Sequence, residues 1–482
     1  MEFDRDLTSI QQMRHAVAAA AQAQEKLCVM SQAETDRICK AVSEAALSHS
    51  RELAAMAVEE TGFGNAPDKT EKNDFAAKRV WEAIAEMKTR GILRRDETAG
   101  VTDIGTPVGV VAAIVPSTNP TSTVIYKALI CLKAGNAAVF SPHPKAEKCT
   151  RRTVELLMEA ARRAGCPEGA LGVISPTMEA TSALMKHPDV RVILATGGSG
   201  MVRAAYSSGK PAIGVGAGNG PAYVHRSADF DKAAEAIIRS KTFDNGTICA
   251  AEQSVIVEKC CAEKLRAALK KHGAYLMNTE EAGRLATFLM RPNGTINPEV
   301  VGKTAHHLAK LAGFEVPAQT TVLIAHEKEA GPTRPYSREK LCPVLACFEA
   351  ESEDAVLQKV CEVLAVEGSG HTFSIHAQDD AVIERFALKV PVSRFLVNTP
   401  AALGGIGATT NLFPALTLGC GAVGGSSSSN NIGPLDLINI RRVARGVREA
   451  PASKVPERNT MTVDNDLIER LTAQIMEKLE KM

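Results

Sequence analysis

Five short apolar runs alternate with helical segments between residues 108 and 215, and this alternation constrains the fold more than any other feature of the chain. The runs are VGVVAAIV (108–115), AAVF (137–140), LGVIS (171–175), VRVILAT (190–196) and PAIGV (211–215). Continuous apolar runs separated by helices are typical of parallel strands that are buried on both faces of a sheet. The pattern therefore predicts an α/β fold with a doubly wound parallel sheet.

Ligands of such a sheet bind beyond the carboxyl ends of its strands. The segments that follow the five predicted strands are Pro116–Pro120, Ser141–Lys145, Ser175–Thr177, Thr196–Gly200 and Val215–Gly220. Thr196–Gly200 follows a strand and opens a helix, so its backbone N–H groups are placed to face an anion. A tight turn that requires glycine explains this segment equally well.

A second alternating block begins near residue 221 and predicts a second α/β domain with its own core. Its expected strands are PAYV (221–224), QSVIV (253–257), TVLIA (321–325), PVLACF (343–348), TFSIH (372–376) and RFLVN (394–398), with helices such as AEKLRAALKKH (262–272) between them. Helical periodicity also covers residues 6–60 and 74–90, whereas residues 404–433 read as a loop rich in Gly and Ser.

The end of the chain stands apart from both blocks. EAPASKVPERNT (449–460) has the composition of a linker. In residues 464–482 the apolar positions fall on one face of a predicted helix, with Glu and Lys opposite; they are Leu467, Ile468, Leu471, Ile475, Leu479 and Met482. Docking to a partner, packing within an oligomer and a frayed tail are all compatible with this pattern.

Composition excludes several classes of protein. Lys and Arg number 56 against 55 Asp and Glu, and a net charge of +1 gives no electrostatic reason to expect a nucleic acid or an anionic membrane as partner. The apolar run Val110–Val115 is far shorter than the ~18 residues of a membrane span, and the polar start MEFDRDLTSI is unlike a secretory signal. Twelve cysteines without a Cys-x-x-Cys pair indicate free thiols and no zinc site. We therefore expect a cytoplasmic protein.

Cys249 is the best candidate for a nucleophile. It follows an Asn-Gly turn and precedes the strand QSVIV, which predicts a loop-to-strand junction facing a cleft. A thiolate reacts strongly even when it is a minor species. On spacing alone, a buried core cysteine is the commoner alternative. His143 and His371 lie in loops beside predicted strands and are further candidates, but plain loop histidines are more frequent.

One glycine motif is rejected. Gly419–Gly424 matches G-x-G-x-x-G, but serines and asparagines follow it instead of a helix, so it does not open a βαβ unit.

Four segments in order resemble the aldehyde dehydrogenase superfamily, specifically its CoA-acylating branch, over about residues 1–445. They are IVPSTNPTS (114–122), AVFSPHPKA (138–146), DNGTICAAEQ (244–253) and REKLCPVLA (338–346). The resemblance implies two Rossmann-like domains, one for the cofactor (1–220) and one for catalysis (221–412). It also implies a return segment with a small oligomerisation element (413–448), followed by a linker and helix (449–482).

The resemblance also implies roles for particular residues. Cys249 is the expected nucleophile, Asn119 holds the oxyanion with the Cys249 backbone N–H, and Glu339 binds the nicotinamide ribose. The remaining positions expected along the cofactor are Val115, Pro116, Ser141, His143, Pro144, Gly197, Gly198, Met201, Gly216 and Leu341. His371, in a Gly-His-Thr stretch, resembles a feature of the acylating branch.

One departure from the family pattern bears on the reaction. Hydrolytic aldehyde dehydrogenases carry a Glu-Leu-Gly-Gly segment whose glutamate activates water, and here Val215 stands in its place within IGVGAGNG (213–220). Water attacking a thioester needs a positioned base, whereas a thiol forms its thiolate near neutral pH. The sequence therefore predicts transfer of the acyl group to coenzyme A.

The resemblance implies oxidation of a short-chain aldehyde with NAD, or NADP, and coenzyme A, by a homodimer or tetramer. The C-terminal helix resembles the peptides that load such enzymes into bacterial microcompartments, where shell proteins would be the partners of residues 464–482. Two alternatives stay open: a hydrolytic enzyme with its base elsewhere, and a catalytically silent scaffold protein.

Overall fold

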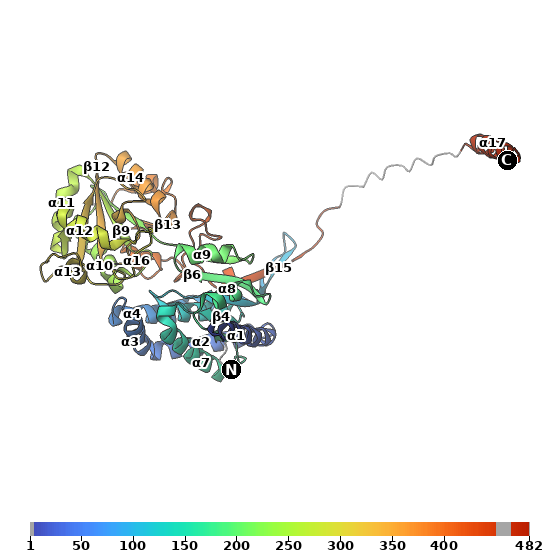
Figure 1. The fold of residues 1–482 in the computed structure, drawn as a ribbon, viewed down its shortest axis with the longest axis horizontal. Coiled ribbons are helices and arrows are strands. Elements are labelled where there is room, and N and C mark those ends of the chain that lie inside the picture. Colours follow the sequence, from blue (N-terminus) through green and yellow to red (C-terminus); the bar gives the residue numbers. More distant parts are fainter. Residues whose placement is uncertain (1–3, 450–463, 482) are drawn as a thin grey trace. The chain divides into compact units, whose positions relative to one another are not determined.

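The computed structural model describes residues 4–449 and 464–481 and divides them into two compact units. One unit runs to Arg94 and continues over Asp103–Arg441. The other contains Arg95–Thr102 and the chain from Arg442 onward. Both α/β layers lie in the first unit (Figure 1).

The first α/β layer is a parallel five-stranded sheet in the order β5-β4-β3-β6-β7. Its strands are β3 (Val110–Ile114), β4 (Ala138–Ser141), β5 (Leu171–Val173), β6 (Val190–Thr196) and β7 (Ala212–Val215). The crossover helices are α6 (Pro120–Lys133), α7 (Glu147–Arg163), α8 (Met178–Lys186) and α9 (Ser199–Tyr206). All five predicted strands are confirmed. The strand order reverses at β3, so a ligand crevice is expected beyond the ends of β3 and β6.

The second layer is a parallel seven-stranded sheet in the order β10-β11-β12-β9-β8-β13-β14. Its strands are β8 (Gly220–Val224), β9 (Glu252–Glu258), β10 (Ala274–Leu276), β11 (Val322–Glu327), β12 (Val344–Ala350), β13 (Gly370–His376) and β14 (Val392–Val397). The six predicted strands are present, and the short edge strand β10 is additional. Three residues at an edge carry too little periodicity to be recognised in the sequence.

Helices cover both faces of this second sheet (Figure 1). One core cluster joins the sheet to α10 (Phe230–Thr242) and α11 (Ala262–Lys271). Another joins it to α12 (Thr279–Leu289), α13 (Ala305–Leu311), α14 (Glu353–Val366) and α15 (Asp380–Ala387). On the central strands, alternate residues enter the two clusters: on β8, Tyr223 packs in one while Ala222 and Val224 pack in the other.

The N-terminal part is helical, with α1 (Arg5–Leu27), α2 (Gln32–Ser48), α3 (Ser50–Thr61), α4 (Ala66–Asp74), the π-helical turn η1 (Phe75–Arg79) and α5 (Val80–Ile84). The helix expected over residues 74–90 is wrong at both ends, since helical structure already begins at Ala66 and stops at Ile84. Beyond it, the backbone N–H groups of Thr89 and Arg90 donate to the side-chain oxygen of Gln32 at 2.9 and 3.2 Å. That oxygen satisfies backbone donors of the non-helical segment that follows α5.

The remaining elements are short or stand apart. β1 (Gly91–Asp96), β2 (Val101–Pro107) and β15 (Ile438–Ala444) form a third sheet in the order β1-β2-β15. The short helical segments are η2 (Pro144–Ala146), η3 (Phe243–Gly246), η4 (Lys259–Cys261), η5 (Pro335–Ser337), α16 (Ala401–Gly405), η6 (Ala422–Gly424) and η7 (Pro434–Leu437). The expected loop 404–433 is thus largely irregular, and its glycine motif forms only the turn η6.

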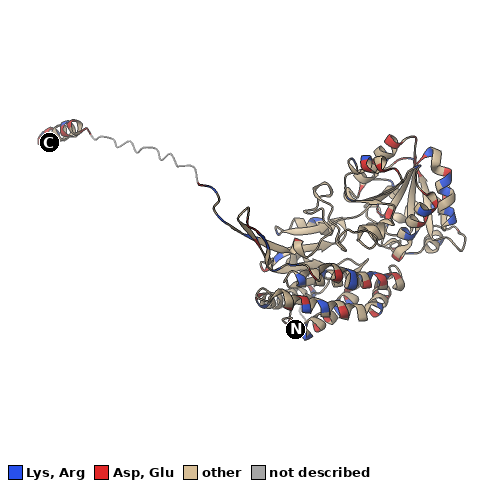
Figure 2. Cartoon of the chain, turned by 180° about the vertical axis from the view of Figure 1, so that it is seen from behind, with Lys and Arg blue, Asp and Glu red and all other residues tan. Residues whose placement is uncertain are grey.

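The C-terminal helix α17 (Asn465–Glu480) is present, and its apolar side chains, including Leu467, Leu471 and Ile475, are exposed. All of the predicted linker except Glu449 lies outside the described residues, as does Met482. Acidic and basic residues are interspersed along the helices, while the strands are mostly uncharged (Figure 2). In the part of the chain that the structure describes, every helix is too short or too polar to cross a bilayer.

Candidate active site

A cavity of about 320 Å³ opens where the ends of the first sheet face the loop that leads into β9. Its walls come from segments far apart in sequence: Pro116–Asn119 after β3, His143 and Lys145 after β4, Thr196–Gly198 at the end of β6, Val215–Ala217 at the end of β7, and Thr247–Cys249 before β9. Glu339 and Leu341, before β12, also line it. Four of the five predicted strand-end segments therefore contribute, and Ser175–Thr177 does not.

Cys249 lies at the predicted loop-to-strand junction, partly buried and on the wall of the cavity. Burial and, to a smaller extent, the nearby Glu339 carboxylate together raise the pKa of its thiol to about 12. Near neutral pH the sulfur is therefore held as a thiol, and it needs deprotonation before it can act as a nucleophile.

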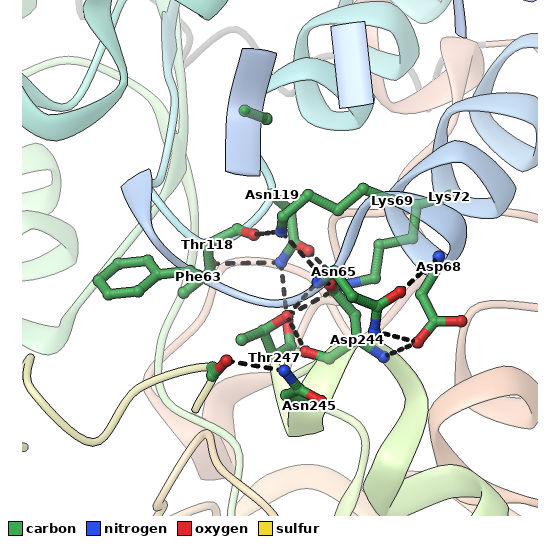
Figure 3. Close-up of polar contacts among 12 residues, drawn as sticks. Phe63, Asn65, Asp68, Lys69, Lys72, Thr118, Asn119, Asp244, Asn245 and Thr247 are labelled. Atoms are coloured by element: carbon green, nitrogen blue, oxygen red, sulfur yellow. Dashed lines mark hydrogen bonds and ion pairs between the residues drawn. The ribbon is translucent and has the colours of Figure 1, made fainter. Parts of the chain in front are cut away.

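The turn before Cys249 has an unusual backbone. Asp244 and Asn245 both adopt left-handed conformations, with φ of 49° and 51°. Non-glycine residues pay a conformational cost in this region, so surrounding contacts must hold them there. The buried Asp244 carboxylate accepts hydrogen bonds from Lys69 Nζ at 2.8 Å and Lys72 Nζ at 2.5 Å, both from α4 (Figure 3). It also accepts from Thr247 Oγ1 at 2.6 Å.

Asn119 sits at the start of α6 and faces the same turn. Its Oδ1 accepts a hydrogen bond from Lys72 Nζ at 2.6 Å. Its Nδ2 donates to the carbonyl oxygen of Thr247 at 2.9 Å and to Thr118 Oγ1 at 3.2 Å (Figure 3). The amide group thus reaches the segment that carries Cys249, as an oxyanion donor in this cavity must.

Glu339 contributes a carboxyl group to the cavity wall. Its Oε1 accepts a hydrogen bond of 2.9 Å from the Gly218 N–H, and its own N–H donates to Glu367 Oε2. Burial raises the pKa of Glu339 to about 8, with the Glu367 carboxylate adding to the effect. A carboxyl that is largely protonated near neutral pH can both donate and accept hydrogen bonds.

The structure brings together most, but not all, of the predicted site residues. Besides Cys249, Asn119 and Glu339, the residues on the cavity wall are Pro116, His143, Gly197, Gly198, Gly216 and Leu341. Val115, Ser141, Pro144 and Met201 are not among the lining residues. Ser141 is buried, and its hydroxyl is paired with Thr181 Oγ1 at 2.8 Å. The predicted cofactor roles of all these residues stay predictions.

His371 does not line the cavity. It is fully buried at the start of β13, and its Nδ1 lies 2.8 Å from Thr372 Oγ1. Burial lowers the pKa of His371 to about 3, helped by the positive charge of Arg394. The ring is therefore neutral, and its candidate role in the site stays a prediction.

Sequence reasoning missed several cavity residues, above all Lys72, Phe63 and Thr247. Lys69 and Lys72 are three residues apart on one face of α4, but so are many solvent-facing lysines. Nothing in the sequence indicated that this face meets Asp244. Within residues 4–449 and 464–481, no group of three or more His, Cys, Asp or Glu side chains is placed to hold a metal ion.

Comparisons with known proteins agree with this geometry. The model of the aldehyde dehydrogenase family matches residues 6–282. The bifunctional aldehyde-alcohol dehydrogenase AdhE of Escherichia coli K12 is 42% identical over 94% of this chain, and the match covers 51% of AdhE. The chain therefore spans about half the length of the curated relatives that it matches first.

Two solved structures resemble the chain over nearly their whole length. An acetylating aldehyde dehydrogenase from Geobacillus thermoglucosidasius is 51% identical, with a TM-score of 0.92 and coverage of 93% of this chain and 100% of that one. A Rhodopseudomonas palustris propionaldehyde dehydrogenase, solved with bound CoA and an acylated cysteine, is 30% identical, with a TM-score of 0.82 and coverage of 90% and 97%. By fold, site and sequence, this chain belongs to the aldehyde dehydrogenase family.

Proposed function

We propose that the chain oxidises a short-chain aldehyde to its coenzyme A thioester, through an acyl group carried on Cys249. One observation carries the proposal: Cys249 and the Asn119 amide meet in a cavity where Val215 takes the position that hydrolytic relatives give to a glutamate. The acetylating Geobacillus enzyme and the R. palustris enzyme with bound CoA support this assignment.

In the proposed reaction, the Cys249 thiolate adds to the carbonyl carbon of the aldehyde. The Asn119 amide and the Cys249 backbone N–H hold the resulting oxyanion, a contribution typically worth ~10²–10³ in rate per donor. Loss of hydride converts the adduct into a thioester. The thiolate of coenzyme A then attacks the acyl carbon, which releases acyl-CoA and returns Cys249 as a thiolate.

A nicotinamide dinucleotide supplies the hydride acceptor when it is bound. The cavity suits such a group, because Glu339 offers a carboxyl with both donor and acceptor capacity and a Cβ at Gly198 or Gly216 would meet only open space. We propose NAD as the acceptor. Segment Ser141–Lys145 carries no carboxylate to repel the 2′-phosphate of NADP, so NADP is tested beside it.

The decisive experiment follows reduction of NAD and NADP across acetaldehyde, propionaldehyde and longer aldehydes, with and without coenzyme A. We expect sustained turnover only with coenzyme A, and acyl-CoA as the product. Cys249→Ala should abolish NADH formation with every aldehyde. Sustained turnover without coenzyme A, or activity in Cys249→Ala, would contradict the proposal.

A hydrolytic reaction is the second candidate, and Glu339 is the observation that favours it. Its carboxyl lines the cavity and influences the pKa of the Cys249 thiol, so its carboxylate form is a potential base for water. The free acid as sole product in the presence of coenzyme A would select this reaction.

For the C-terminal extension we propose docking to a bacterial microcompartment shell protein. The exposed apolar face of α17 supports a binding role, because such a face gains free energy when a partner covers it. Deleting residues 450–482 should leave aldehyde oxidation intact and abolish co-assembly with shell proteins. Retained co-assembly would exclude this role, and a simultaneous change in oligomeric state from the proposed dimer or tetramer would assign the helix to subunit packing.

A further inference from the structure

Lys72 connects the nucleophile turn to the proposed oxyanion donor. Its side chain is 2% exposed, although it lies on α4, well before either of the segments it contacts. Its Nζ donates to Asp244 Oδ2 at 2.5 Å, Asn119 Oδ1 at 2.6 Å and Thr247 Oγ1 at 3.2 Å (Figure 3). The ammonium group also lies 5.6 Å from the centre of the Phe243 ring.

Charge balance alone does not require this arrangement. Lys69 already forms a buried ion pair with Asp244, and its remaining contact is with the Thr118 carbonyl. Of the two lysines, Lys72 is the one that donates to Asn119. The two side chains share the carboxylate but differ in their contact with the amide, which makes Lys69 a matched control for Lys72.

The contact acts on the Asn119 side chain in two ways. An ammonium can only donate, so it fixes Oδ1 toward α4 and directs Nδ2 to the other side, where Nδ2 donates to the Thr247 carbonyl and to Thr118 Oγ1. The positive charge of the Lys72 ammonium next to Oδ1 also polarises the Asn119 amide, which makes its N–H groups stronger donors in a buried site.

We propose that Lys72 is a positioning residue that holds and polarises the Asn119 amide for oxyanion binding. This inference rests on the proposed function of Asn119. It predicts that Lys72 accelerates formation of the acyl-enzyme through Asn119, and that it does not act by binding dinucleotide or coenzyme A.

The test uses full-length Lys72→Met and Lys69→Met, with single-turnover NADH formation in the absence of coenzyme A. We expect Lys72→Met to slow acylation by about 10–100-fold, since it impairs one oxyanion donor without removing it. The NAD concentration that gives the half-maximal single-turnover rate should be unchanged. Lys69→Met should slow acylation by less than about a third of the factor found for Lys72→Met, although both variants lose one ion pair to Asp244. Equal losses in the two variants would overturn the proposal, because they would indicate a shared structural role.

A double-mutant cycle separates this inference from the function on which it rests. If Lys72 acts through Asn119, Lys72→Met should have little further effect in an Asn119→Ala background. Losses that multiply in the double variant would overturn the inference while leaving Asn119 as a donor. An unchanged acylation rate in Asn119→Ala would instead refute the proposed oxyanion role. If Lys72→Met does not fold, Lys72→Gln, which keeps an uncharged donor, takes its place in the same cycle.

Discussion

The backbone of Gly218 passes directly against the backbone of Cys249. A Cβ atom at position 218 would lie 1.9 Å from the Cys249 carbonyl oxygen, far inside any permitted contact. The same glycine donates its N–H to Glu339. A single residue without a side chain therefore fixes the spacing between the end of β7, the proposed nucleophile Cys249 and the proposed ribose-binding carboxyl of Glu339.

Gly218→Ala should for this reason disable the site without unfolding the sheets. The added methyl group meets backbone, so the Cys249 segment must move, and a displacement of about 1 Å can cost ~10²-fold in rate. We expect at least that loss in kcat. Gly283→Ala in α12, where a Cβ meets open space, is the control and should keep full activity. Near-normal kcat in Gly218→Ala would show that the close approach is not required.

Val215→Glu should introduce hydrolysis. Val215 is 3% exposed and lies on the cavity wall, where a carboxylate could activate water against the thioester. In the absence of coenzyme A, we expect the wild type to stop after one turnover and the variant to continue, forming the free acid. Val215→Gln is the control, because glutamine has nearly the same size as glutamate but has no carboxylate to act as a base. Equal rates in the two variants would show that a base at this position is insufficient.

Alkylation of Cys249 should keep accelerating with pH beyond the range of an ordinary thiol. Because burial raises the pKa of Cys249 to about 12, its thiolate fraction should rise about tenfold per pH unit from pH ~7 to ~10. Iodoacetamide labelling, followed by mass spectrometry of the Cys249 peptide, measures this slope. Free glutathione in the same solution should level off near pH ~9. A plateau for Cys249 at that pH would contradict the buried thiol.

Glu339→Gln should become increasingly stabilising as the pH rises. The pKa of Glu339 is raised from 4.5 to about 8, so between these values the folded protein holds a proton that the unfolded chain releases. Stability from this group is therefore lost as pH increases through the window, whereas glutamine does not titrate. The Tm difference between Glu339→Gln and wild type should grow from pH ~5 to ~8.5. A Tm difference that is independent of pH would refute the assignment.

The local pattern of apolar residues in the sequence was sufficient to predict most of the strands and helices. Strands such as Val110–Ile114 are continuous apolar runs with polar or glycine-rich ends, so their type and position follow from nearby residues. The edge strand β10 and the end of the helix at Ile84 escaped prediction. Both depend on partners elsewhere in the chain: β10 pairs with β11, and Gln32 accepts the N–H groups that follow the helix.

The sequence by itself determined the two α/β blocks, and it singled out Cys249 as the candidate nucleophile and Val215 as the residue expected in place of a glutamate, because each of these features lies in a short contiguous stretch. Only the tertiary structure decided that Lys72 lies against Asp244, 172 residues further along the chain, and against Asn119. On its own helix Lys72 looks like any solvent-facing lysine. Its burial is a property of the surfaces that close over it, and the raised pKa values of Cys249 and Glu339 have the same origin, since desolvation depends on what surrounds a group.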